Sequence, residues 1–92
     1  MSPNNGDTLT REKVLEKVIA IASEQLMVDA SGILEKNDFA DDLGADSLDS
    51  VELIMSLEDE YGLKIEEADA EKLITIGLVT DHIFSKLTNA EG

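Results

Sequence analysis

Ser47 lies between two aspartates, Asp46 and Asp49, immediately before an apolar-rich run. Serine and aspartate are typical of a helix start, where a side-chain oxygen accepts a hydrogen bond from an unpaired backbone N–H. We therefore expect a helix to begin here, capped by Ser47, with both carboxylates at the positive end of its dipole. Gly44 indicates a turn before the helix, since glycine adopts backbone angles that other residues avoid.

The serine does not fit a catalytic nucleophile. A nucleophilic serine needs a base within reach and an oxyanion hole. His82 is the only histidine, and no Gly-x-Ser-x-Gly turn surrounds Ser47. We expect His82 at the edge of the last helix, and we predict that the chain has no catalytic residue and is not an enzyme.

The acidic residues do not fit a tight calcium loop either. An EF-hand loop has acids at positions one, three and five and glycine at position six. Placing Gly44 sixth makes Phe39 the first residue, and placing Gly62 sixth makes Leu57 the first. We predict no metal site, and at most weak ion screening by neighbouring acids, namely Glu58, Asp59 and Glu60.

The composition favours one small domain with an aliphatic core. The chain has 92 residues, no cysteine and a formal net charge of −14. Without cysteine it has no disulfide and no thiolate of its own. Its aromatic residues are few: Phe39, Tyr61 and Phe84.

The negative charge is concentrated around Ser47. No lysine or arginine occurs between Lys36 and Lys64, an interval that holds nine acids. Such a surface is repelled by nucleic acid and by anionic membranes, and it attracts partners with basic patches. We expect a monomer that does not bind nucleic acid and does not insert into membranes. The acids of the interval are Asp38, Asp41, Asp42, Asp46, Asp49, Glu52, Glu58, Asp59 and Glu60.

Hydrophobic periodicity predicts an all-α fold, a small four-helix bundle with a long loop between helices 1 and 2 and a short third helix. Thr8 or Thr10 caps the first helix, which ends near Met27. Its apolar positions are Leu15, Val18, Ile19, Ala22 and Leu26. The connection over 28–46 is long, and four apolar residues should anchor it to the core: Ile33, Leu34, Phe39 and Leu43.

The second helix should run from Ser47 to Tyr61 and stop at Gly62. One stripe faces the core: Ser50, Leu53, Ile54, Leu57 and Tyr61. A second apolar stripe comprises Leu48, Val51 and Met55. A globular helix normally has one such stripe. The second therefore either packs inward beneath the loop, which is open for Val51, or forms an exposed docking strip with an acidic rim.

Two further helices complete the bundle. The third covers Glu67 to Leu73, and the last begins near Thr75 and ends near Leu87. Thr80 occupies a position where an aliphatic residue is expected, so packing there should be looser. The apolar side of the last helix comprises Ile76, Val79, Ile83 and Leu87.

The chain ends carry no targeting or membrane signal. We expect a flexible tail over 1–9, one domain over 10–88 and a frayed end over 89–92. No apolar run approaches membrane-spanning length, and the N-terminus lacks the pattern of a signal peptide. We therefore expect a cytoplasmic protein, or an organelle-matrix protein if a presequence was removed.

The string Leu43-Gly44-Ala45-Asp46-Ser47-Leu48, followed by Asp49, Val51, Glu52, Leu53 and Met55, strongly resembles the acyl carrier proteins. The resemblance covers roughly residues 10–87. It implies that Ser47 carries 4′-phosphopantetheine through a phosphodiester, with Asp46 and Leu48 beside it. Two positions depart from the family pattern: Met27 stands where a glycine is frequent, and Glu66-Glu67 stand where a proline or a capping residue is frequent.

The resemblance also implies a function. The chain would carry acyl intermediates as thioesters in fatty-acid biosynthesis, and a phosphopantetheinyl transferase and fatty-acid synthesis enzymes would be its partners. These enzymes would dock on Leu48, Asp49, Val51, Glu52, Met55, Glu58 and Asp59. The acyl chain would enter a pocket near Ile54, Leu57, Ile65, Ala70, Leu73 and Ile76.

Two alternatives remain open. The chain could be a carrier of a polyketide, aminoacyl or specialised lipid pathway, which the charge pattern disfavours only moderately. It could also be an acidic interaction subunit of a larger complex, such as a respiratory complex, in which Ser47 would have no role.

Overall fold

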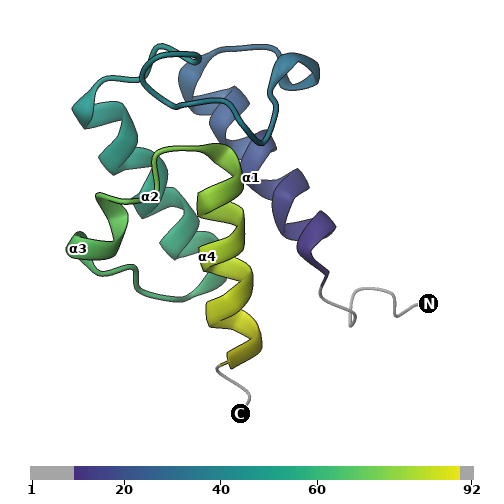
Figure 1. Cartoon of the computed structure of the whole chain (residues 1–92), viewed down its shortest axis with the longest axis vertical. Helices are drawn as coiled ribbons and strands as arrows, with labels where there is room; N and C mark the ends of the chain where they lie inside the picture. Colours follow the sequence, from purple (N-terminus) through teal and green to yellow (C-terminus); the bar gives the residue numbers. More distant parts are fainter. Residues whose placement is uncertain (1–9, 90–92) are drawn as a thin grey trace.

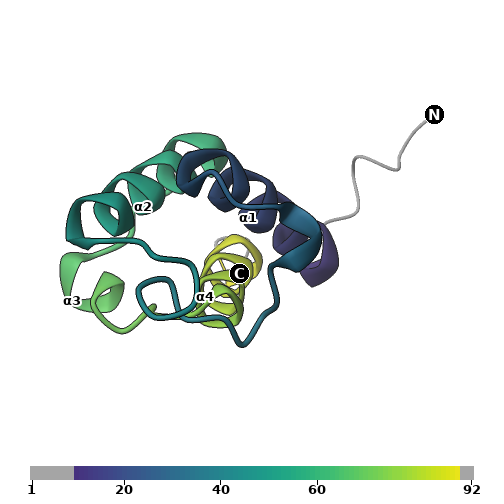
Figure 2. The ribbon, with the colours of Figure 1, turned by 90° about the horizontal axis from the view of Figure 1, so that it is seen from above.

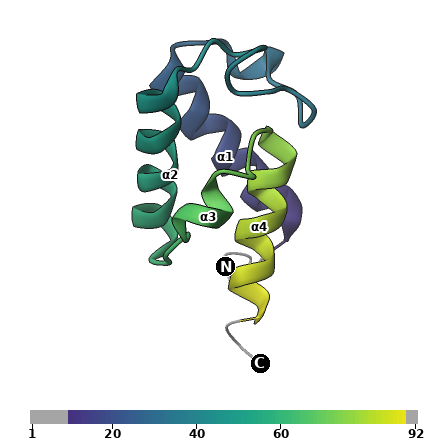
Figure 3. The same cartoon turned by 60° about the vertical axis from the view of Figure 1, so that its left-hand side comes forward.

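A computed structural model describes residues 10–89, and the predicted all-α fold is confirmed. The elements follow the order α1 (Arg11–Leu26), η2 (Ala30–Gly32), α2 (Ser47–Tyr61), α3 (Glu67–Ala70) and α4 (Ile76–Asn89). The three long helices pack around one core, and the short α3 lies between α2 and α4 (Figures 1 and 3). The expectations for residues 1–9 and 90–92, and for Thr8 as a cap, lie outside the described residues.

The first helix begins at the predicted cap. The Thr10 side chain accepts a hydrogen bond from the backbone N–H of Lys13 at 3.2 Å. The fully buried stripe of α1 is Val14, Val18 and Ala22, at spacings of four residues. Val14 was missing from the predicted stripe. That stripe was centred further round the helix, on a wider apolar face that includes the half-buried Leu15, Ile19 and Leu26.

The core is aliphatic, as expected. Helix α1 packs against both α2 and α4, and the end-on view in Figure 2 shows α4 next to α1. Thr80 is fully buried, and its hydroxyl donates to the Ile76 carbonyl at 2.9 Å, so the polar atom has a partner. The buried hydrophobic residues are Val14, Val18, Ala22, Ile33, Phe39, Ala45, Leu53, Leu57, Ile65, Ile76, Val79 and Ile83.

Three of the four predicted anchors hold the connection between α1 and α2. Ile33 and Phe39 are buried, and Leu43 packs against the core half-buried. The prediction was wrong for Leu34, whose side chain is 51 % exposed. Its backbone N–H donates to Asn37 Oδ1 at 2.6 Å, and this tight turn after Ile33 leaves the Leu34 side chain outside the core.

The same connection also supplies hydrogen-bond acceptors for the start of α4. The N–H of Ile76 donates to the Asn37 carbonyl at 3.2 Å, and that of Gly77 donates to the Glu35 carbonyl at 2.8 Å. The Phe39 N–H in turn donates to the Ile74 carbonyl at 3.0 Å. A side chain at position 77 would place its Cβ 3.2 Å from the backbone carbonyl oxygen of Glu35, so glycine permits this close approach.

Arg11 ties α1, the connection and α4 together. Its guanidinium contacts Glu35 Oε1 at 2.6 Å and Asp81 Oδ1 at 2.5 Å. These hydrogen bonds, that to Glu35 foremost, raise the pKa of Arg11, and the bond from Arg11 lowers the pKa of the Glu35 carboxyl. A carboxyl with a lowered folded-state pKa stabilises the fold above its unfolded pKa, and this contribution is lost as the pH falls through the folded value.

The boundaries of the last two helices differ slightly from prediction. Helix α3 ends at Ala70 rather than Leu73, because a turn over 71–72 follows it. No side-chain hydrogen bond caps α3 at Glu66. Helix α4 starts at Ile76, with Thr75 Oγ1 accepting from the Leu78 N–H at 3.2 Å.

Met27 ends α1 in the left-handed region, with φ 58° and ψ 45°. Its side chain is 89 % exposed, so it contributes little packing. A residue with a side chain loses about 1–2 kcal/mol of stability in this region. Glycine avoids this loss, but it also makes the unfolded chain more flexible, which cancels part of the gain. We predict that Met27→Gly raises the free energy of unfolding by about 0.5–1 kcal/mol in urea titrations. Met27→Ala is the control, and a glycine variant no more stable than the alanine variant would contradict the prediction.

Candidate functional site

Asp46, not Ser47, caps α2. The Asp46 side chain accepts from the Asp49 N–H at 2.8 Å, and Asp49 Oδ2 accepts from the Asp46 N–H at 3.2 Å. This reciprocal pair is a capping box, and it corrects the prediction that Ser47 caps the helix. A carboxylate accepts this bond at least as well as a hydroxyl, and it has the added attraction of the helix dipole.

Ser47 is therefore the exposed first residue of α2 with a free hydroxyl. Among residues 10–89, nothing forms a hydrogen bond with Ser47 Oγ or with the backbone N–H groups of Ser47 and Leu48. Free N–H groups at the start of a long helix favour an anion. The position thus combines an accessible nucleophilic oxygen with two free donors beside it.

A compact turn holds the start of α2 in place. Asp38 Oδ1 accepts from the N–H groups of Ala40 and Asp41 at 2.8 and 3.0 Å. The Ala45 N–H donates to the Phe39 carbonyl at 2.8 Å, and Gly44 has φ 76°, which favours glycine. Because Phe39 and Ala45 are both buried, the turn is fixed to the core directly before Ser47.

The second apolar stripe of α2 faces solvent. Leu48, Val51 and Met55 are 63 %, 54 % and 56 % exposed. The opposite stripe faces the core, with Leu53 and Leu57 buried and its other members half-buried. The alternative that Val51 packs beneath the loop is therefore not observed. An exposed apolar strip of this kind can contact other molecules.

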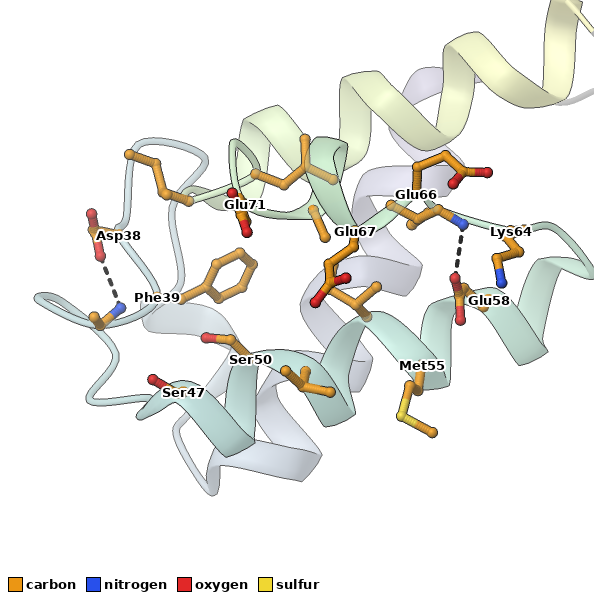
Figure 4. Close-up of a pocket in the computed structure, with 17 residues that line it drawn as sticks. Asp38, Phe39, Ser47, Ser50, Met55, Glu58, Lys64, Glu66, Glu67 and Glu71 are labelled. Carbon is orange, nitrogen blue, oxygen red and sulfur yellow. Dashed lines mark hydrogen bonds between the residues drawn. The ribbon is translucent and has the colours of Figure 1, made fainter.

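Acids flank this exposed strip. Glu52 and Asp59 are exposed, and Asp49 is half-buried through its part in the capping box. Glu58 differs from the others, because its Oε2 accepts from the Ile65 N–H at 2.7 Å and holds the chain that follows α2 (Figure 4). Glu58 thus has a structural role beside the docking role predicted for it.

A pocket of about 740 Å³ opens between α2 and α3, with Ser47 on its lining (Figure 4). Four of the six predicted pocket residues line it, namely Ile54, Ile65, Ala70 and Leu73. Leu57 and Ile76 do not, because both are fully buried in the core behind it.

Several pocket residues were missed from the sequence. Phe39 and Ser50 line the pocket, as do Val51 and Met55 of the exposed strip. Ser50 carried a usable signal, since a polar residue within the core-facing stripe of a helix indicates a surface that is not closely packed. Nothing in the sequence signals that the connection before α2 forms a wall. The remaining polar lining consists of Asp38, Glu58, Lys64, Glu66, Glu67 and Glu71.

Three further features of residues 10–89 bear on function: possible metal ligands, the histidine and the lengths of the helices. Residues 10–89 contain no group of three or more potential metal-ligating side chains. His82 is half-buried, and its buried Nε2 has no hydrogen-bond partner among these residues. No helix in this range is long and apolar enough to cross a lipid bilayer.

Residues 16–83 match the family model described as "Phosphopantetheine attachment site". The chain belongs to this family. It is 49 % identical over 79 residues to the acyl carrier protein of Thermosynechococcus vestitus, covering 86 % of this chain and 98 % of that protein. It is also 47 % identical over 78 residues to the acyl carrier protein of Thermotoga maritima, covering 85 % and 96 % of the two chains.

A solved structure supports the same assignment. The acyl carrier protein from Enterococcus faecalis is 42 % identical and superposes with a TM-score of 0.72, covering 84 % of this chain and 98 % of that one. The predicted family, its all-α fold and its phosphopantetheine attachment are thus confirmed. The chain is a carrier, and it is not itself a catalyst.

The crowded acids around the site predict a salt-dependent stability. Repulsion among exposed carboxylates opposes folding and is screened by ions. The melting temperature should therefore rise by several degrees, about 5 °C, between 10 and 500 mM NaCl, and Asp41→Asn should raise it most at low salt. Asp41 is exposed and lies within the acidic interval. A melting temperature that does not change with salt would refute this account.

Proposed function

We propose that Ser47 is the residue to which phosphopantetheine is attached, and that the chain carries acyl groups for fatty-acid synthesis. The observation that carries the proposal is the free, exposed Ser47 hydroxyl at the start of α2, next to two unpaired backbone N–H groups. The attached group supplies a terminal thiol on which acyl chains are held as thioesters. This sulfur chemistry is otherwise missing from a chain without cysteine.

The surroundings of Ser47 fit a phosphodiester. The free N–H groups of Ser47 and Leu48 point from the positive end of a 15-residue helix, a position that favours a negative charge. The nearby carboxylates of Asp46 and Asp49 each accept a backbone N–H, which offsets part of their repulsion of a phosphate. Exposure of Ser47 leaves room for the enzyme that modifies it.

The α2 surface supports docking of enzymes with basic patches, including the phosphopantetheinyl transferase and the enzymes of fatty-acid synthesis. Leu48, Val51 and Met55 supply apolar contact area, and the flexible thioether of Met55 suits several partners. Asp49, Glu52 and Asp59 border the strip; Glu58 contributes charge at its pocket side. Charge complementarity of this kind speeds encounter more than it strengthens binding, as a carrier with successive partners requires.

The pocket between α2 and α3 supports transient shielding of the acyl chain. Its inner lining is apolar, with Ile54, Ile65 and Leu73 among the contributing residues. Its outer lining is acidic and includes Glu66 and Glu67 of the chain around α3. An aliphatic chain gains about 0.8 kcal/mol for each methylene that it buries, so it would favour this interior over water.

Intact-mass measurement tests the attachment. After co-expression with a phosphopantetheinyl transferase, the wild-type chain should gain the mass of one phosphopantetheine, and Ser47→Ala should gain none. Ser50→Ala is the matched control, since Ser50 lies one turn further along α2 and should leave the modification intact. An unmodified wild-type chain, or a Ser47→Ala chain that is still modified, would end the proposal. The masses of thioester-bound groups isolated from cells would separate fatty-acid synthesis from a polyketide or aminoacyl pathway.

A pocket-filling substitution tests the acyl site. The octanoyl-loaded wild-type chain should melt at least about 5 °C above the unloaded phosphopantetheinyl form, because the acyl chain buries apolar surface only in the folded state. Ala70→Leu should reduce this gain by half or more, since Ala70 lines the pocket. Ala68→Leu on the same short helix is exposed, lies outside the pocket and should keep the gain. Equal gains in all three chains would show that the acyl group does not bind here.

A further inference from the structure

We infer that Gln25 and Ser56 are positioning residues that direct the Glu52 carboxylate toward a cationic side chain of the docking transferase. The inference rests on the docking surface proposed above and extends that surface from α2 onto the end of α1. Gln25 and Ser56 are absent from the docking residues predicted from the sequence, and neither is charged.

A shallow hollow of about 380 Å³ lies where the end of α1 meets the middle of α2. Glu52, Met55, Ser56 and Asp59 line it from α2, at spacings of three, four and seven residues that place them on one face of the helix. Gln25 completes the lining from α1. Met55 belongs to both the exposed strip and this hollow, so the two surfaces are continuous.

Two hydrogen bonds connect the polar residues of the hollow in one direction. Ser56 Oγ donates to Gln25 Oε1 at 3.3 Å, and Gln25 Nε2 donates to Glu52 Oε1 at 3.3 Å. The serine thus orients the amide so that its N–H groups face the carboxylate. Among residues 10–89, nothing forms a hydrogen bond or ion pair with the second oxygen, Glu52 Oε2, so this atom stays available to a partner.

The hollow fits a lysine or arginine of the partner. Two carboxylates, Glu52 and Asp59, stand about 10 Å apart along the helix, with the 56 % exposed Met55 between them. A long basic side chain has an apolar stem for the thioether and a cationic head for a carboxylate. No lysine or arginine of residues 10–89 lines the hollow, so the partner must supply the cation.

Orienting the Glu52 carboxylate before docking should lower the free-energy cost of binding the transferase. Immobilising a flexible side chain at an interface costs about 0.5–1.5 kcal/mol, and a carboxylate already held by Gln25 avoids part of that cost. The substitution Gln25→Met keeps the size of the side chain and removes both hydrogen bonds. In steady-state assays of phosphopantetheinyl transfer from coenzyme A, it should raise KM for the carrier about two- to fivefold and leave kcat unchanged.

The Ser56 variants supply a second, independent measurement. Ser56→Ala removes the donor to Gln25 and should raise KM in the same direction, whereas Ser56→Thr keeps a hydroxyl and should restore the wild-type value. A purely structural role would lower the melting temperature without this difference between alanine and threonine. Thermal melts of every variant accompany the kinetics.

Coupling to Glu52 is the deciding test. Glu52→Gln should raise KM. Gln25→Met added to it should cause no further increase, because Gln25 then has no carboxylate to orient. Glu24→Gln changes the net charge equally at an exposed position of α1 outside the hollow, and it should leave KM unchanged.

The outcomes separate the two proposals. A wild-type chain that the transferase leaves unmodified would overturn the proposed function and, with it, this inference. If Glu52→Gln raises KM but Gln25→Met does not, or if the two effects add in full, the docking surface stands and the positioning role is refuted. A KM increase that vanishes in the Glu52→Gln background, together with rescue by Ser56→Thr, establishes the role.

Discussion

The reciprocal hydrogen bonds of Asp46 and Asp49 are the interaction on which the site depends. The start of a helix leaves several backbone N–H groups without a partner in the helix. Side chains, water or a ligand accept their hydrogen bonds instead. Because the two aspartates satisfy each other's N–H groups, Ser47 keeps its hydroxyl free. A serine that capped the helix itself would have its oxygen occupied by a backbone N–H. The aspartates therefore start α2 and leave Ser47 available for the attachment proposed above.

The acidic surface sets a second constraint, because the charge that is proposed to attract partners also opposes folding. A net charge of −14 on 92 residues generates repulsion that a small aliphatic core must outweigh. The tie from Arg11 to Glu35 and Asp81 offsets part of this repulsion and joins α1 to the connection and to α4. None of these three residues belongs to α2, so this tie stabilises the fold without pairing the acids that border the exposed strip.

The sequence predicted those features that depend on residues close together in the chain. Periodicity identified α2 to the residue, and it placed Leu48, Val51 and Met55 on one stripe, because helical spacing fixes which side chains share a face. It left open whether that stripe packs inward, and the structure shows it exposed. Position along the chain could not decide between two adjacent capping residues, so Asp46 was overlooked in favour of Ser47. Contacts between distant segments, such as the hydrogen bonds from Ser56 to Gln25 and from Gln25 to Glu52, had no signal in the spacing of residues.

The short α3 is the least supported wall of the pocket. It has four residues, no side-chain cap and no buried residue, whereas α1 and α4 are long and packed on the core. Elements with few buried contacts and unsupported ends open at low free-energy cost. The wall formed by α3 can therefore move away from α2 while the capped start of α2 stays fixed. Because α3 and Ser47 belong to different elements, an opening of α3 on loading the proposed acyl pocket need not move the start of α2.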